Sequence, residues 1–436
     1  MVTARSEGPR LGFSPKLVVI ALFGVLVRTM LMLTVTRHKD LGFDAAYYSL
    51  LARALAHGHG FVDPFALYIG HRVRPTALYP PGYPVVLAAF ARVGMGSRTW
   101  RLFVGCGLGG VSIVLCGRLA RHFLSERPSL VVAALAAVYP MLVGADASGM
   151  SEALYLPLIL VALLLAMRCS GPRAWPWALL GVTIGLAALT RDEGLVYLFV
   201  LAIPSAIVAE GTALRRAALF GLTAVGVVGV LAPWMIRNDL AFGHPVLIAN
   251  SSSTTLGGAN CRDTYYGGRL GSWSYPCLNA HRPGAARLSE TTLNDQIRRE
   301  GLSYMEHHAA RVPFVVLVRL VRTYGLYDDT RAYAADLGAW FTLGWLMYLA
   351  LLPFAIVGAV VIRRRRADLQ AQELVALLAP VVAVTLVTIA SYGSPRFRIA
   401  AEPVVLVLAV VGGGALVRHH RPRRDRFVSR SGLGAR

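Results

Sequence analysis

Residues 17–36 read LVVIALFGVLVRTMLMLTVT, an apolar run long enough to cross a bilayer as one α-helix. The run has no small-residue cleavage site, so we interpret it as a retained first span and not as a signal peptide. The same character extends over the whole chain of 436 residues, of which 56% are apolar and 15% are charged. This composition excludes a water-soluble globule and predicts an all-α integral membrane protein.

Nine further apolar runs give, with the first, about ten predicted transmembrane helices. They lie at residues 99–120, 129–145, 152–168, 174–190, 194–209, 216–236, 338–362, 373–391 and 399–417. Two long loops separate some of them, at residues 37–98 and 237–337. A short N-terminus (1–16) precedes the membrane domain (17–417), and a basic tail (418–436) follows it.

The basic residues predict the orientation in the membrane. The net charge of +21 does not indicate nucleic-acid binding, because the arginines gather in short clusters between apolar runs. Cytoplasmic loops carry such clusters, so the four arginines at 363–366 and both termini are expected in the cytoplasm. Seventeen of the 23 acidic residues then fall on the outer face, where we expect the chemistry. Arginine outnumbers lysine 42 to 2, which is typical of GC-rich bacterial genomes and suggests a bacterial plasma (inner) membrane.

Both long loops are predicted to carry helices that lie in the membrane interface. In residues 45–57 and 83–93, apolar and aromatic side chains recur at helical spacing, which suits a helix with its aromatic side toward the bilayer. Residues 312–324 are apolar enough to span, but Arg319 and Arg322 interrupt the run. A buried arginine costs at least about 2.5 kcal/mol there, so we expect this segment to be interfacial as well.

Two of the five cysteines share the second outer loop. Cys261 and Cys277 would meet an oxidising exterior, which favours a disulfide, although two unpaired thiols remain the alternative. Cys106 and Cys116 lie in a predicted span, and Cys169 is predicted to be cytoplasmic.

Asp44 is the first candidate for chemistry. An aspartate at the start of a helix is ordinarily an N-cap, which satisfies free amide groups. The same helix end also favours the ionised carboxylate, which is then available as a base. The two roles are compatible.

Several short motifs follow one another along the predicted outer face. They are Asp44-Ala45-Ala46-Tyr47-Tyr48, His57-Gly58-His59-Gly60-Phe61, Tyr79-Pro80-Pro81-Gly82-Tyr83-Pro84, Ser151-Glu152-Ala153-Leu154, Thr190-Arg191-Asp192-Glu193-Gly194, Arg237-Asn238, Phe242-Gly243-His244-Pro245 and Pro395-Arg396-Phe397-Arg398. In this order the chain resembles the GT-C superfamily of membrane glycosyltransferases, in the branch of protein O-mannosyltransferases and aminoarabinose transferases. The resemblance extends over about residues 17–417.

The resemblance implies a transferase that moves a sugar from a polyprenyl phosphate to an acceptor outside the cytoplasm. It assigns the general base to Asp44. An inverting displacement needs one carboxylate to accept the acceptor's proton, and positive charge for the phosphate leaving group. The implied partners are a polyprenyl-phosphate sugar, a protein, glycolipid or lipoglycan acceptor, and the bilayer, without nucleic acid. Neither the sugar nor the acceptor follows from the sequence.

Five arginines are candidates for the phosphate site, because a guanidinium keeps its charge and binds phosphate through two hydrogen bonds. They are Arg191, Arg396, Arg398, Arg72 and Arg74. Arg191 ranks first, since the resembling family places a phosphate-binding Lys or Arg there. Its alternative role is an ion pair with Asp192 or Glu193. Arg396 and Arg398 have the alternative of snorkelling at the interface.

Four more residues complete the predicted substrate site. Asp146 and Glu152 bracket the start of a span where the resembling family has a second acidic position, although either also suits a helix cap. Tyr48 follows Asp44, and Tyr79 stands where the family usually shows His or Lys before Pro-Pro. The family's donor geometry therefore does not transfer directly.

The sequence predicts neither a metal site nor a cofactor. His57 and His59, or His307 and His308, have no matching carboxylate cluster, and the pair at 328–329 lacks Asp-x-Asp spacing. The competing interpretations are a secondary transporter or flippase of a lipid-linked or small polar substrate, and a non-catalytic scaffold. A transporter is disfavoured because no internal repeat is visible and the acids lie at helix ends.

Overall fold

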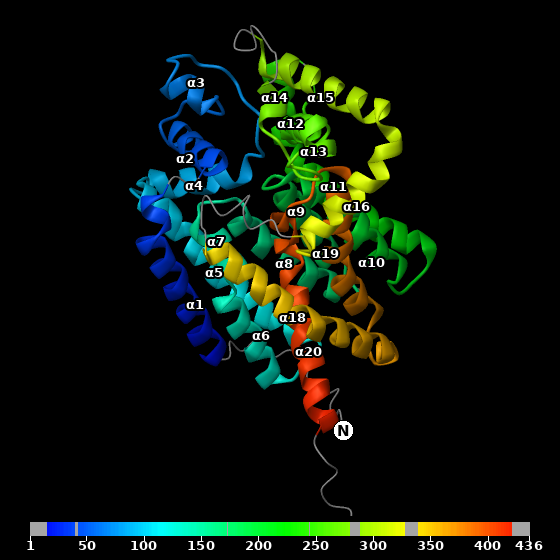
Figure 1. Ribbon diagram of the computed structural model, residues 1–436. Helices are drawn as coiled ribbons and strands as arrows, with labels where there is room; N and C mark the ends of the chain where they lie inside the picture. Colours follow the sequence, from blue (N-terminus) through cyan, green and yellow to red (C-terminus); the bar gives the residue numbers. More distant parts are fainter. Residues whose placement is uncertain are drawn as a thin grey trace, which may run out of the picture.

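The computed structural model describes residues 15–39, 42–171, 173–243, 245–279, 288–327 and 339–420. Most of residues 1–16 and 418–436, the pair 328–329, Asp40 and His244 lie outside these ranges. In the described ranges the regular elements are helices, and no β-strand is present (Figure 1). This confirms the predicted all-α, multi-pass membrane class.

Six helices in the described ranges are long and apolar enough to cross a membrane. They are α1 (Pro15–Thr34), α5 (Arg98–Ala120), α11 (Ala213–Phe242), α18 (Ala339–Arg364), α19 (Ala371–Ala390) and α20 (Glu402–His420). A seventh span results if α6 (Glu126–Val138) and α7 (Pro140–Ala147), which meet at a bend of 52°, are counted together. The bend has a local cause, because a residue before proline avoids the helical conformation and Tyr139 is extended.

The predicted count of ten spans is not confirmed, although all ten segments contain helix. Two of them are shorter than expected: α8 (Glu152–Arg168) has 17 residues and α9 (Trp175–Ala188) has 14. The segment predicted at 194–209 is broken into a 3-10 turn (Asp192–Leu195), a π-helical turn (Leu198–Ala202) and α10 (Ile203–Ile207). Pro204 cannot donate a backbone hydrogen bond, which explains why the pattern of helical hydrogen bonds is irregular at this point.

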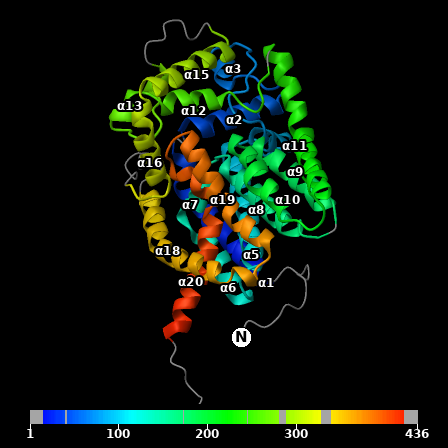
Figure 2. The ribbon, with the colours of Figure 1, turned by 90° about the vertical axis from the view of Figure 1, so that its right-hand side faces the viewer.

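The helices of the two long loops gather at one end of the bundle. The first loop forms α2 (Gly42–Ala56), α3 (Pro64–Tyr68) and α4 (Gly82–Arg92). The second forms α12 (Ser251–Ala259), α13 (Arg262–Tyr266), α14 (Pro276–Asn279), α15 (Glu290–His307) and α16 (Val312–Thr323). Figures 1 and 2 show α2, α3, α12 and α15 at this end, whereas α20 ends at the opposite one.

The aromatic faces of α2 and α4 pack inside the protein, which corrects the prediction that they face the bilayer. Tyr47, Tyr48 and Leu51 are buried together with Tyr83 and Leu87. The rings of Tyr48 and Tyr83 meet edge to face, with centroids 5.5 Å apart. Helical periodicity alone does not distinguish a lipid-facing side from one covered by another helix.

Arg319 and Arg322 on α16 are also buried in protein. Arg319 Nη2 donates to the carbonyl oxygen of Ala259 at 3.0 Å, and Arg322 Nε donates to that of Leu270 at 2.7 Å. The two guanidiniums therefore hold α16 against the second loop, because they satisfy carbonyl groups that its irregular backbone leaves free. With 12 residues, α16 is not among the candidate spans.

Glu290 joins the two loops. Its carboxylate accepts hydrogen bonds from Thr76 Oγ1 (2.6 Å), the Ala77 amide (3.0 Å) and Asn250 Nδ2 (2.8 Å). Burial raises the pKa of Glu290, and these three hydrogen bonds oppose that rise. The contact fixes the start of α12 relative to the loop that precedes α4.

Candidate active site

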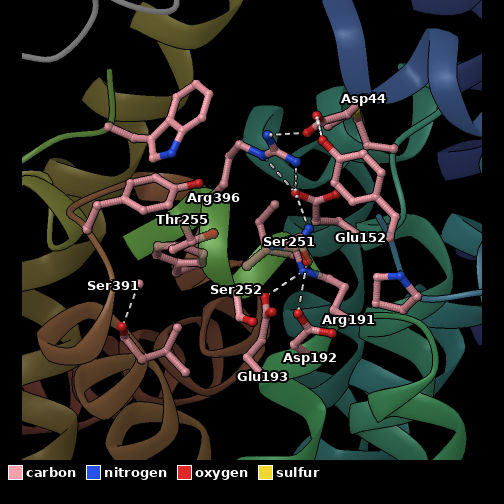
Figure 3. A pocket seen from close by; sticks show the side chains of 18 of the residues that line it. Asp44, Glu152, Arg191, Asp192, Glu193, Ser251, Ser252, Thr255, Ser391 and Arg396 are labelled. Carbon is pink, nitrogen blue, oxygen red and sulfur yellow. Dashed lines mark hydrogen bonds and ion pairs between the residues drawn. The ribbon is translucent and has the colours of Figure 1, made fainter. Parts of the chain in front are cut away.

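A cavity of about 1170 Å³ lies where the two loops meet the ends of the spans. Its wall combines charged groups with a long apolar surface. The charged and polar side is drawn in Figure 3, where Asp44, Glu152, Arg191 and Arg396 lie close together. The apolar side comes mainly from α18, α19 and the segments beside α10 and α20, through Phe199, Phe341, Leu386, Val387, Ile389, Ala390, Phe397 and Ile399.

Helix ends deliver the charged groups. Asp44 lies in the first turn of α2, after Gly42, whose φ of +81° suits a residue without a side chain. Glu152 is the first residue of α8. Arg191 follows α9, and Arg396 belongs to a 3-10 helix (Pro395–Ala400) before α20. Residues distant in the sequence therefore converge because the helices begin or end at the same level of the bundle.

Arg396 bridges two carboxylates. Its Nη1 lies 3.2 Å from Asp44 Oδ2, and its Nη2 lies 2.8 Å from Glu152 Oε1. Burial lowers the pKa of this guanidinium, but Glu152 and Asp44 raise it by more, so the net pKa is well above the ordinary value. Arg396 is therefore a permanent cation that faces the cavity.

Arg191 shares the same glutamate. Its Nη1 lies 2.9 Å from Glu152 Oε1, and its Nε lies 2.5 Å from Glu193 Oε1. The pKa of Arg191 is raised, because these two carboxylates outweigh the effect of burial. Glu152 is 2% exposed and holds both arginines beside each other, although like charges repel. The alternative ion pair of Arg191 with Glu193 is thus present, in addition to the pair with Glu152.

Asp44 is held on both of its oxygens. Tyr79 donates its hydroxyl hydrogen to Asp44 Oδ1 at 2.6 Å, while Oδ2 faces Arg396. Burial and the neighbouring Asp44 carboxylate raise the pKa of Tyr79, so this hydroxyl remains a donor. Tyr48 lines the cavity next to Asp44, and its hydroxyl donates to Ser151 Oγ at 3.4 Å.

Asp192 is a further acid on the cavity wall. Its Oδ2 accepts a hydrogen bond from Ser251 Oγ at 3.0 Å. Within the described ranges, Oδ1 is buried and has no partner. Burial, with a contribution from Glu193, raises the pKa of Asp192 to about 7.

The structure brings six of the ten predicted site residues together, and four lie elsewhere. The six cavity residues are Asp44, Tyr48, Tyr79, Glu152, Arg191 and Arg396. Arg72 and Arg74 belong to the segment between α3 and α4 and do not line the cavity. Asp146 and Arg398 are also absent from its wall.

Asp146 and Arg398 are instead paired in the interior. Arg28 Nε lies 2.7 Å from Asp146 Oδ2, and its Nη1 donates to the carbonyl oxygen of Ala137 at 2.9 Å. Arg398 Nε lies 2.5 Å from Glu402 Oε1. Both arginines are fully or almost fully buried, so their partners offset the cost of removing the charges from water. Asp146 and Arg398 therefore form internal ion pairs away from the cavity.

Sequence reasoning missed the contribution of the second loop. Ser252, Thr255 and Trp273 line the cavity, as do Ser251 and Leu256. The run of hydroxyl residues at 251–255 was a usable signal, since it includes pairs three apart, such as Ser252 and Thr255, that share one helical face. A disulfide joins Cys261 to Cys277, with Cα atoms 6.3 Å apart, and encloses Trp273. Among the described residues, no three His, Cys, Asp or Glu side chains gather at a metal-binding spacing.

Residues 79–236 match the model of a family described as dolichyl-phosphate-mannose-protein mannosyltransferase. The match includes Tyr79, Glu152 and Arg191 but is confined to about a third of the chain. No curated protein matches the sequence significantly.

Solved structures of an archaeal oligosaccharyltransferase share the fold, with TM-scores above 0.5. The archaeal oligosaccharyltransferase AglB from Archaeoglobus fulgidus, in complex with an inhibitory peptide and a dolichol-phosphate, is 14% identical, with a TM-score of 0.54 over 93% of this chain and 50% of that chain. The Archaeoglobus fulgidus oligosaccharyltransferase tethered with an acceptor peptide is 15% identical, with a TM-score of 0.54 over 93% and 49%. ArnT from Cupriavidus metallidurans, bound to undecaprenyl phosphate, is 13% identical, with a TM-score of 0.46 over 93% and 79%.

The chain spans about half the length of these oligosaccharyltransferases. The shared part is the membrane fold, which agrees with the predicted GT-C-like architecture.

Proposed function

We propose that the protein is a glycosyltransferase that takes a sugar from a polyprenyl-phosphate donor and transfers it to an extracytoplasmic acceptor. The observation that carries this proposal is the contact between Asp44 and Arg396 at 3.2 Å, in a cavity that also has a long apolar wall. A base, a phosphate-binding cation and a lipid-compatible surface then face the same space. The matches to a mannosyltransferase family and to the fold of oligosaccharyltransferases support this assignment.

The reaction is an inverting displacement. The acceptor's hydroxyl oxygen bonds to the anomeric carbon of the sugar, and its proton passes to a carboxylate oxygen of Asp44. The bond between the anomeric carbon and the phosphate oxygen breaks, and the phosphate leaves with the electron pair. The leaving group needs positive charge rather than a proton, because a polyprenyl phosphate is stable as an anion. One carboxylate and nearby arginines therefore suffice.

Arg396 is suited to the phosphate. Its guanidinium presents several N–H donors, and a phosphate oxygen competes with a carboxylate for them. Phosphate binding would draw Arg396 away from Asp44 Oδ2 and leave that oxygen free to accept a proton. Arg191 supplies the second cation, held next to Arg396 by their common partner Glu152.

The apolar wall is suited to the polyprenyl chain. The end of α19 contributes Leu386, Val387 and Ile389 to this wall. The π-helical turn contributes Phe199. Leu386 and Phe199 are exposed apolar side chains, at 45% and 58%. Apolar surface of this kind favours a hydrocarbon chain over water.

The distribution of basic residues supports a cavity that lies outside the cytoplasm. The arginines at 363–366 follow α18, at the end of the bundle remote from the loop helices. The positive-inside rule then puts this end and both termini in the cytoplasm of a bacterial cell.

Replacement of Asp44 tests the proposal. Membranes that contain the wild-type protein should transfer radiolabelled sugar from polyprenyl-phosphate-mannose to cell-envelope material, and D44N should reduce this rate by at least about 100-fold. D63N is the matched control, because Asp63 caps α3 in the same loop but does not line the cavity. If D44N retains full turnover while its membrane level is normal, the base assignment is wrong.

A further inference from the structure

The indole of Trp273 is fixed rigidly on the cavity wall. Its Nε1 donates to the carbonyl oxygen of Thr254 at 3.1 Å. The ring packs directly on Gly258, where an added Cβ would come within 2.2 Å of Nε1. The disulfide between Cys261 and Cys277 closes the loop around it. The ring nevertheless remains partly exposed and lines the cavity.

A hydroxyl-bearing face of α12 lies beside this indole. Ser252 and Thr255 line the cavity, and Figure 3 shows them on the same side as Ser251. In the part of the chain that the structure describes, the hydroxyls of Ser252 and Thr255 make no hydrogen bond with protein. Ser251 and Thr254 donate to Asp192 Oδ2 and to a backbone carbonyl, which leaves their oxygen lone pairs as acceptors.

This wall differs in chemistry from the rest of the cavity. The donor's phosphate needs Arg191 and Arg396, and its lipid needs the apolar wall of α19. The wall formed by α12 and Trp273 offers neutral hydroxyl groups next to a preformed aromatic surface. Sugars combine hydroxyl groups with an apolar C–H face, and the C–H face stacks on an indole ring while the hydroxyls bond to neutral partners. Preorganisation of the ring reduces the entropy lost on binding.

We propose that Trp273, Ser252 and Thr255 form the acceptor subsite and that the acceptor is a carbohydrate, carried on a glycolipid or lipoglycan. The acceptor's sugar ring stacks on Trp273, and its hydroxyls bond to α12. The inference rests on the proposed function, since it divides that same cavity into a donor side and an acceptor side. A peptide acceptor is the contrasting outcome.

Saturation-transfer difference NMR on the full-length protein in detergent tests the subsite without turnover. The probes are methyl α-D-mannopyranoside, methyl α-D-arabinofuranoside and the neutral peptide acetyl-Ala-Thr-Ala-amide. The wild type should saturate ring C–H protons of at least one glycoside and none of the peptide. W273A should weaken that binding about tenfold, and W273F should restore most of it. W175A is the matched control, because Trp175 is exposed at the start of α9 and does not line the cavity.

A second, milder variant tests the same subsite in case W273A misfolds. The double substitution S252A/T255V removes two hydroxyls without opening the packing under the indole, and it should weaken the same glycoside several-fold. Equal glycoside contact in W273A and the wild type, or contact with the peptide alone, would overturn the inference. Binding of undecaprenyl phosphate to the same samples is measured in parallel. If the wild type does not bind it, the proposed function fails, whereas unchanged lipid binding in W273A with lost glycoside contact supports the subsite.

Discussion

Asp44 and Arg396 are separated by 352 residues in the sequence, and their side chains meet at 3.2 Å. Asp44 opens the first loop helix, and Arg396 precedes the last span. The first and last parts of the membrane domain thus contribute the proposed base and the proposed phosphate ligand. This relationship makes both residues testable with separate readouts.

Replacement of Arg396 by glutamine should weaken donor binding. The variant loses the cation that is proposed to bind the donor's phosphate. The KM for polyprenyl-phosphate-mannose should therefore rise at least about tenfold. R396K should recover only part of this, because lysine lacks the planar fork of donors. Arg72 provides the control, since R72Q removes the same charge outside the cavity. An equal rise in R72Q would show that the effect is one of general surface charge.

Removal of the Tyr79 hydroxyl should affect turnover more than donor affinity. Y79F leaves the ring in place but frees Asp44 Oδ1 from its 2.6 Å hydrogen bond. Asp44 then loses a constraint on its orientation, and kcat should fall by about tenfold with little change in the donor KM. Tyr275, which is exposed and outside the cavity, gives the control Y275F. An unchanged kcat in Y79F would exclude a positioning role.

Asp192 should make stability depend on pH. Its pKa in the folded protein is raised to about 7, so folding favours the protonated acid. The penalty is absent below the unfolded pKa of about 3.9 and grows as pH rises toward 7. The melting temperature in detergent should therefore fall more steeply between pH 4 and pH 7 in the wild type than in D192N. The exposed Asp239 supplies the comparison D239N, which should follow the wild type.

Thiol labelling should find two of the five cysteines protected. Unfolded, non-reduced protein should react at Cys106, Cys116 and Cys169, and all five thiols should react after reduction. Mass spectrometry after alkylation distinguishes the two results. Modification of Cys261 and Cys277 without reductant would show that the loop around Trp273 is not cross-linked.

The sequence by itself determined the class of the molecule. Apolar runs near 20 residues, separated by arginine clusters, permit little other than a helical membrane bundle, because an unpaired backbone group is too costly in lipid. The same patterns placed Asp44 at a helix start and located Arg191 between two helices. Length alone did not decide the span count, since Pro140 and Pro204 interrupt helices whose composition is uniformly apolar.

Only the tertiary structure decided which charges share a site. Asp146 and Glu152 look alike in sequence, six residues apart, yet one pairs with Arg28 in the interior and the other holds Arg191 and Arg396 at the cavity. Arg396 and Arg398 differ in the same way, because side chains two residues apart in a 3-10 helix point to different sides. Such pairings depend on distances between helices, which a single sequence does not encode locally. The physical cause is the high cost of an unpaired buried charge, which selects whichever partner the packing brings near.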